Sequence, residues 1–234
     1  MDDSLANEAF VFIKPHAAAS EKVLSFVRRT LEERGITIRN HGFLTGAEIG
    51  RRGITDLHYA AIAQYGAVME PANLPMENQG RARFLEAFGF EWDPGRVRNA
   101  AQFALETGLT TQAQNDLWED SRYAKMGPGL YMARLEAPGC EARVVVNGFY
   151  PSLREKMTQN GATVIWYDTR FSPDVLSWRA FRATVIGSTH PGHADPESIR
   201  GRLYLFPELY GLRERPTVQE NGVHASAGPL EAAR

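Results

Sequence analysis

The order of the periodic segments near the start of this chain is the feature that most constrains its fold. A short apolar run at 9–13 is typical of a buried strand, and Pro15 ends it because proline cannot continue a strand ladder. Ser20 is a suitable N-cap for a helix that ends at Gly35. Residues 36–44 then alternate as a second strand, and a further helical pattern follows it. This end of the chain therefore has the order strand, helix, strand, helix.

A second ordered region follows a long middle part that has no single period. Residues 69–161 carry several Pro and Gly and mixed periodicity. After them the sequence predicts a strand at 162–167, a helix at about 174–184 and a short last strand at 203–206. The tail from 207 onward is expected to be mostly loop with one short helical end. Within the middle part, the expected elements are helices at 81–88, 96–105 and 151–156 and strands at 130–135 and 142–146.

Together the two ordered regions predict an α+β fold. Without the middle part, the elements match a ferredoxin-like βαββαβ sandwich core that carries one extra helix. We therefore expect this core to be formed by residues 1–68 and 162–234. Residues 69–161 are expected to form a large α/β insertion subdomain, for which the sequence indicates no role.

Composition excludes several classes of protein. Apolar residues make up 43% of the chain and charged residues 23%, as in ordinary globular proteins with a core. The formal net charge of -2 gives no global positive field, so nucleic acid is not expected as a partner. Cys140 is the only cysteine, which rules out an intrachain disulfide and a cysteine-rich metal site. The chain has no apolar run of membrane-spanning length and no signal-peptide pattern, so we expect no membrane partner and a cytoplasmic location.

Three places in the chain stand out for chemistry. Lys14 directly follows the first strand, and open α/β sheets commonly carry functional groups at the carboxyl ends of their strands. Thr189 and Arg200 flank a loop that is too polar and too rich in Pro and Gly to be packing structure. His224 lies in a polar cluster beyond the expected last strand. Any of these residues alone would most often be an ordinary surface residue.

Taken together, these segments resemble the nucleoside diphosphate kinase family. They are similar to that family's Lys-Pro-Asp strand motif, its His-Tyr pair, its phosphate loop closing on Ile-Arg-Gly, and its Asn-x-x-His-Gly-Ser signature. The resemblance spans 1–68 and 162–234 and nothing between them. The matching segments, in chain order, are Phe12-Ile13-Lys14-Pro15, Leu57-His58-Tyr59, the segment 189–201 (called the phosphate loop below) and Asn221-Gly222-Val223-His224-Ala225-Ser226.

The resemblance implies a phosphotransferase that works by ping-pong double displacement through a phosphohistidine. His224 would be the nucleophile that takes the γ-phosphate of ATP or another nucleoside triphosphate. The phosphate would then pass to a nucleoside diphosphate or a related phosphorylated acceptor. Mg²⁺ would be held through the nucleotide phosphates and water, with no protein ligand. The implied partners are these nucleotide substrates and further copies of the chain in a homo-oligomer.

The resemblance also implies a role for each matching residue. Lys14 would contact sugar hydroxyl and phosphate, and Tyr59 would hydrogen-bond near the transferred phosphate. Thr189 and Arg200 would hold the β- and γ-phosphates, Arg200 as a forked donor. Asn221 would bind the ribose 3′-hydroxyl.

Two further roles complete the implied site. Ser226 would orient the nucleophile. The family's second phosphate-binding arginine belongs at the position that is Ala183 here. Arg182, one step away, would supply this charge through a one-residue bulge, and Arg179 is the alternative.

Departures from the family pattern leave the acceptor open. His16 stands where the family has an aspartate. The glutamate that partners the family's catalytic histidine would fall past Arg234, and Glu231 is the candidate to replace it. At the position of the aromatic residue that covers the base, this chain has Ala67, with Tyr65 nearby.

Two classes of function stay open at this point. The leading prediction is an active phosphotransferase of the kind just described. The alternative is a catalytically degenerate module that binds a nucleotide or a partner. Retention of His224 favours the enzyme, because a binding module has no need for a nucleophile. The chain between Arg200 and Asn221 is longer than in the family, so the acceptor need not be an ordinary nucleoside diphosphate.

Overall fold

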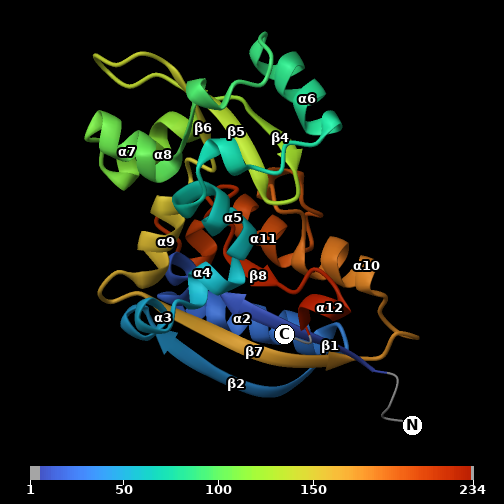
Figure 1. The fold of residues 1–234 in the computed structure, drawn as a ribbon. Coiled ribbons are helices and arrows are strands. Elements are labelled where there is room, and N and C mark those ends of the chain that lie inside the picture. Colours follow the sequence, from blue (N-terminus) through green and yellow to red (C-terminus); the bar gives the residue numbers. More distant parts are fainter. Residues whose placement is uncertain (1–5, 233–234) are drawn as a thin grey trace. The chain divides into compact units, whose positions relative to one another are not determined.

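The structure is a computed structural model that describes residues 6–232. The chain forms two compact units (Figure 1). Unit 1 consists of Met1–Ile49 and Met157–Arg234, and unit 2 of Gly50–Lys156. Unit 2 is therefore larger than the expected insertion, because residues 50–68 pack with it rather than with the core.

Unit 1 is built on a four-stranded sheet with the strand order β2-β7-β1-β8. All three neighbouring pairs are antiparallel. This is the order that a ferredoxin-like βαββαβ chain produces, so the predicted core fold is confirmed. The strands are β1 (Asn7–Ile13), β2 (Thr37–Thr45), β7 (Thr163–Phe171) and β8 (Val223–Ala225).

Helices bury their apolar faces in the core of unit 1. Helix α2 (Glu21–Glu33) buries Val23, Val27 and Leu31 completely, at the helical spacing that the sequence shows. These side chains pack with Val11 of β1 in one cluster. The remaining helices of this unit are α1 (Pro15–Ala18), α10 (Trp178–Ala180), the π-helix η5 (Phe181–Ile186), η6 (Pro191–His193), α11 (Ile199–Leu205), η7 (Glu208–Tyr210) and α12 (Pro229–Ala232), while α3 (Gly46–Arg52) crosses the boundary between the units.

Two predictions for the C-terminal part were wrong. The expected strand at 203–206 is mostly helix α11, whose N-cap Ser198 accepts a hydrogen bond from the Gly201 amide. The cap starts the helix before the short apolar run, and Ile199 and Leu203 then face the core four residues apart. The last strand is β8, so His224 lies on a strand rather than beyond one.

Unit 2 contains its own four-stranded sheet, in the order β3-β6-β5-β4. Strand β3 is parallel to β6, and the other two pairs are antiparallel. The helix expected at 96–105 begins later, because Asn99 ends β3 and forms a capping box with Gln102. The strands are β3 (Val97–Asn99), β4 (Tyr123–Gly127), β5 (Leu130–Leu135) and β6 (Arg143–Val146).

The helices of unit 2 are short. They are α4 (Ile54–His58), α5 (Ala60–Ala63), the π-helix η2 (Gln64–Val68), η3 (Pro71–Asn73), α6 (Asn78–Phe88), η4 (Pro94–Arg96), α7 (Ala100–Thr107) and α8 (Thr111–Glu119), while α9 (Tyr150–Thr158) runs across the boundary. Among the residues described in either unit, no helix has the length and hydropathy of a membrane span.

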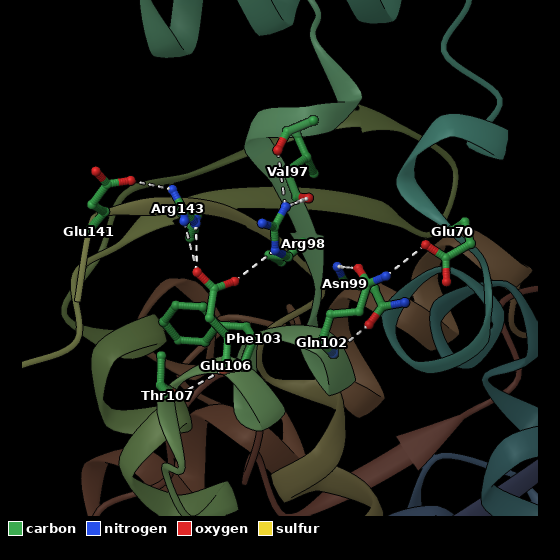
Figure 2. Close-up of polar contacts among 11 residues, drawn as sticks. Glu70, Val97, Arg98, Asn99, Gln102, Phe103, Glu106, Thr107, Glu141 and Arg143 are labelled. Atoms are coloured by element: carbon green, nitrogen blue, oxygen red, sulfur yellow. Dashed lines mark hydrogen bonds and ion pairs between the residues drawn. The ribbon is translucent and has the colours of Figure 1, made fainter.

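An ion-pair network joins α7 to two strands of unit 2 (Figure 2). The carboxylate of Glu106 accepts hydrogen bonds from Nε of Arg98 at 2.7 Å and from Nε of Arg143 at 2.9 Å. Arg143 also donates to Glu141 at 2.8 Å. The hydrogen bond from Arg143, with a smaller contribution from Arg98, holds the pKa of Glu106 below its usual value. The network therefore stabilises the contact of α7 with β3 and β6.

Candidate active site

His224 is held from one face by an aromatic ring. Strand β8 pairs with β1 so that His224 lies opposite Phe12. The two rings are stacked, with centroids 4.8 Å apart and planes 18° apart. Phe12 is buried, and the His224 side chain is partly accessible at 21% exposure. Stacking keeps the imidazole nearly parallel to the buried phenyl ring. Rotation of the imidazole out of this plane is therefore restricted, which limits the directions in which its nitrogen atoms point.

The edge of the His224 ring meets a carboxylate. Oε1 of Glu231, on α12, lies 3.5 Å from Nε2 of His224. Oε2 of the same group accepts a hydrogen bond from the Ala227 amide at 2.6 Å. A carboxylate beside Nε2 favours the tautomer that carries its proton on Nε2, which leaves the lone pair of a neutral imidazole on Nδ1. Glu231 therefore lies where the candidate replacement for the family's glutamate was expected.

Arg200 is buried and contacts the strand that carries His224. Its Nη2 and Nε donate to the Val223 carbonyl at 2.8 and 3.2 Å. Its Nη1 donates to the Gly187 carbonyl at 2.9 Å. The guanidinium thus joins the residue before the nucleophile to the chain that leads into the phosphate loop.

Lys14 is also buried and is covered by the long segment before His224. Its Nζ donates to the Gln219 carbonyl at 2.5 Å, and its backbone amide donates to the Gly222 carbonyl at 2.9 Å. Close by in sequence, Nδ1 of His16 lies 3.6 Å from a carboxylate oxygen of Glu220. Glu220, in the long segment before His224, is therefore the acid that faces His16. His16 stands where the family pattern has an aspartate.

Asn221 connects the nucleophile's segment to the phosphate loop. Its side chain is buried, and Nδ2 donates to the carbonyls of Thr189 and Val218 at 3.0 and 3.1 Å. Thr189 itself is exposed. The Asn221 amide thus fixes the backbone of the loop at the residue whose side chain was predicted to bind phosphate.

Arg182 reaches the turn that follows β8. It lies in the π-helix η5, which places one more residue in each turn than an α-helix does. Its Nη1 donates to the Ala227 carbonyl at 3.3 Å, and Ala227 is also the residue whose amide contacts Glu231. A π-helix contains the wider turn that a one-residue bulge produces, and Arg182 lies within it.

Ser226 forms backbone contacts rather than a contact with the imidazole ring. Its Oγ accepts a hydrogen bond from the Phe10 amide at 3.0 Å, and its own amide donates to the Phe10 carbonyl at 2.9 Å. Ser226 therefore continues the pairing of the C-terminal segment with β1, and any orienting effect on His224 acts through the strand register.

Tyr59 differs from the other predicted residues because it belongs to unit 2. It follows α4, and its ring lies edge-on to that of His58, 4.7 Å away. Helix α4 is anchored within this unit because Asp56 accepts hydrogen bonds from the Tyr150 hydroxyl and from Nε of Arg154. Burial and the bond to Asp56 raise the pKa of Tyr150 above its usual range. The other predicted residues, His224, Lys14, Arg182, Thr189, Arg200, Asn221 and Ser226, all belong to unit 1.

Two contacts in this region had no signal in the sequence. Phe12 alternates with the core residues Val11 and Ile13, which places it on the other face of the sheet. Only the β1–β8 register, which aligns it with His224, identifies it as a neighbour of the nucleophile. The Gln219 carbonyl that accepts from Lys14 is a backbone atom, so no residue pattern could indicate it.

Comparisons with known proteins give similarity at the level of solved structures. No protein-family model matches the chain, and no curated protein does. The chain is similar over 97% of its length to nucleoside diphosphate kinases from Encephalitozoon cuniculi (15% identity, 84% of that chain, TM-score 0.46) and Aquifex aeolicus (14%, 90%, 0.41). It is similar over the same share to a nucleoside diphosphate kinase family protein from Babesia bovis (12%, 84%, 0.44). All three bear the name of the family that the motifs resemble. At such identities and TM-scores the likeness carries no weight for chemistry, and the core fold rests on the strand order of unit 1.

Proposed function

We propose that this protein is a phosphotransferase that moves the γ-phosphate of a nucleoside triphosphate to a nucleoside diphosphate or a related acceptor through a phosphohistidine at His224. One observation carries the proposal. The imidazole of His224 has an aromatic ring on one face and a carboxylate at Nε2, so its orientation is restricted in two directions. Orientation of the nucleophile accounts for much of catalysis in phosphoryl transfer, because the protein has little covalent chemistry to perform.

The reaction consists of two balanced displacements. In the first, the imidazole nitrogen lone pair forms a bond to the γ-phosphorus, the bond to the bridging oxygen breaks, and the nucleoside diphosphate leaves with that electron pair. In the second, a terminal phosphate oxygen of the acceptor forms a bond to phosphorus, and the P–N bond breaks. Glu231 stabilises the positive charge that the imidazole gains in the first step, because its carboxylate faces Nε2.

Charge on the phosphates is neutralised by residues around His224. Arg182 is exposed and reaches Ala227, three positions after the nucleophile, so we assign it to the phosphates rather than Arg179. The exposed hydroxyl of Thr189 donates to the same oxygens, and Lys14 supplies a second cation. Asn221 acts by fixing the loop at Thr189, and Tyr59 is assigned by the motif alone.

Mg²⁺ fits this site as a partner of the phosphates rather than of the protein. Two carboxylates near these residues, Glu231 and Glu220, each already lie against a histidine, His224 and His16 respectively. The other side chains of the site in unit 1 are cations, amides and hydroxyls, which suit phosphate oxygens. When bound, the ion would neutralise charge on the phosphates that Arg182 and Thr189 hold.

The motif resemblance to nucleoside diphosphate kinases also leads us to propose that the protein is a homo-oligomer, which sedimentation velocity would detect.

Labelling with γ-³²P-ATP tests the proposal. We expect a label on the protein that is stable in alkali and labile in acid, which is the behaviour of a phosphoramidate bond. The label should be absent from His224→Ala and present in His41→Ala, which changes an exposed histidine on β2. Absence of label on the wild type, with ATP binding intact by calorimetry, would favour the degenerate nucleotide-binding module instead.

A further inference from the structure

We infer that Arg200 is a positioning residue, which fixes the nucleophile strand to the chain before the phosphate loop and does not bind substrate phosphate. The inference rests on the proposed function of His224 and deepens it. The motif places Arg200 among the phosphate ligands, whereas its contacts in this chain point to a different role.

The contacts of Arg200 are those of a structural clamp. Its guanidinium is a planar fork whose donors match two acceptors at once. Here two donors converge on the Val223 carbonyl and a third reaches the Gly187 carbonyl. The side chain is 7% exposed, so these charge-assisted bonds lie in a region from which water is largely excluded. These bonds occupy three of the five N–H groups of the guanidinium, and turning those three toward a phosphate would leave two buried carbonyls without donors, which is costly.

Both acceptors occupy positions where the backbone determines the geometry of the site. Val223 directly precedes His224 on β8 and is completely buried. Gly187 ends η5 with φ at 94°, a conformation that favours glycine. A Cβ at Gly187 would lie 2.4 Å from Oγ of Ser198, so the backbone here packs too closely against Ser198 for any side chain. One rigid group therefore sets the separation between the nucleophile and the start of the loop.

The position of Arg182 explains how the site can bind phosphate without a contact from Arg200. Arg182 is exposed and contacts Ala227, three residues after the nucleophile, so a second arginine is available to hold the phosphates. The clamp then affects His224 even when no nucleotide takes part. A reaction of His224 with a donor that lacks a nucleoside should depend on Arg200, and nucleotide affinity should not.

Phosphoramidate separates these two effects. In this reaction the imidazole nitrogen forms a bond to phosphorus, the P–N bond of phosphoramidate breaks, and ammonia leaves. We would measure the rate at which His224 is phosphorylated by phosphoramidate, and ATP affinity by calorimetry, in Arg200→Lys and Arg200→Gln. Arg202→Lys on the same helix is the matched control, since Arg202 contacts Tyr210 and Glu197 rather than β8.

A clamp predicts that both Arg200 variants react with phosphoramidate about tenfold more slowly or worse, with ATP affinity within about twofold of the wild type. The lysine variant should fail as the glutamine variant does, because an ammonium cannot bridge both carbonyls. Unchanged phosphoramidate reactivity combined with a large loss of ATP affinity would overturn the inference in favour of a phosphate ligand. Wild-type protein that reacts with phosphoramidate but not with ATP would contradict the proposed function. In that case the rates of the Arg200 variants with phosphoramidate would still support or overturn the role of Arg200 as a clamp.

A second measurement uses the wild type and so does not depend on how well the variants fold. The Nε–H resonance of Arg200, assigned by NMR, should exchange slowly and stay at the same shift when ATP is added. A large shift on addition of ATP, with none for Arg182, would contradict the clamp.

Discussion

The carboxylate of Glu231 bridges His224 and the turn that follows it, with one oxygen 3.5 Å from Nε2 and the other accepting from the Ala227 amide at 2.6 Å. The carbonyl of Ala227 accepts from Arg182 at 3.3 Å. Both polar backbone atoms of this one residue are therefore engaged by side chains that we assign to phosphoryl transfer. The position of the turn thus couples the orientation of the nucleophile to that of the phosphate-binding charge.

Replacement of Glu231 by glutamine should slow the reaction. The amide can still accept from Ala227, but it no longer carries the charge that stabilises a positive imidazole. We expect phosphohistidine formation, followed by rapid quench, to slow roughly tenfold. Glu208→Gln, an exposed change in η7, should leave the rate unchanged. Equal rates for wild type and Glu231→Gln would remove Glu231 from the mechanism.

Replacement of Phe12 by leucine should loosen the His224 ring. Leucine keeps most of the buried volume, so the stability loss should be about 1 kcal/mol. The imidazole protons of His224 should lose the upfield ring-current shift that a stacked phenyl ring causes, and the rate of phosphorylation should fall several-fold. Phe43→Leu, an exposed change on β2, is the control. An unaltered His224 spectrum in Phe12→Leu would show that the stack does not persist in solution.

Arg182 and Arg179 can be distinguished by kinetics. Loss of a charge-assisted contact to phosphate costs roughly tenfold or more in binding, so Arg182→Gln should raise the KM for the nucleotide by about that factor. Arg179→Gln should change little, because Arg179 lies on α10, before the π-helix. The opposite pattern in steady-state kinetics would assign the phosphate contact to Arg179.

The network around Glu106 should make unit 2 sensitive to acid. The pKa of Glu106 lies below its usual value of 4.5, so its stabilising contribution is complete above that pH and is lost as the pH falls through the lower folded value. Glu106→Gln should therefore reduce stability by about 1 kcal/mol at neutral pH and by less in acid. Urea unfolding at several pH values measures this, with Glu86→Gln, an exposed change on α6, as the control. A difference that does not depend on pH would rule out ionisation as its cause.

Much of unit 1 was predictable from the sequence because its strands and α2 carry clear periods. The strand ended by Pro15 and the helix with Val23, Val27 and Leu31 appear where their patterns indicate. The π-helix η5 was not predictable as such, since a π-turn depends on tertiary contacts of Phe181 and Val185 rather than on a local signal.

The sequence predicted residues for the candidate site but not the contacts that these residues make. Motif spacing identified His224 and Arg200, yet showed no sign that Arg200 donates to backbone carbonyls. Backbone acceptors leave no trace in a residue pattern, and the same is true of the Lys14 contact. The mistaken strand at 203–206 has a related cause, because a short apolar run does not distinguish a strand from one turn of buried helix.

The measurement that tests the central claim most directly is a single-turnover chase of the isolated phosphoprotein. The protein is labelled with γ-³²P-ATP, freed of nucleotide and mixed with a nucleoside diphosphate, while the modified residue is mapped at neutral to alkaline pH. We predict that the label resides on His224 and passes to the diphosphate as labelled triphosphate. Label on another residue, or label on His224 that neither a diphosphate nor another phosphorylated acceptor removes, would contradict a phosphotransferase that acts through this histidine.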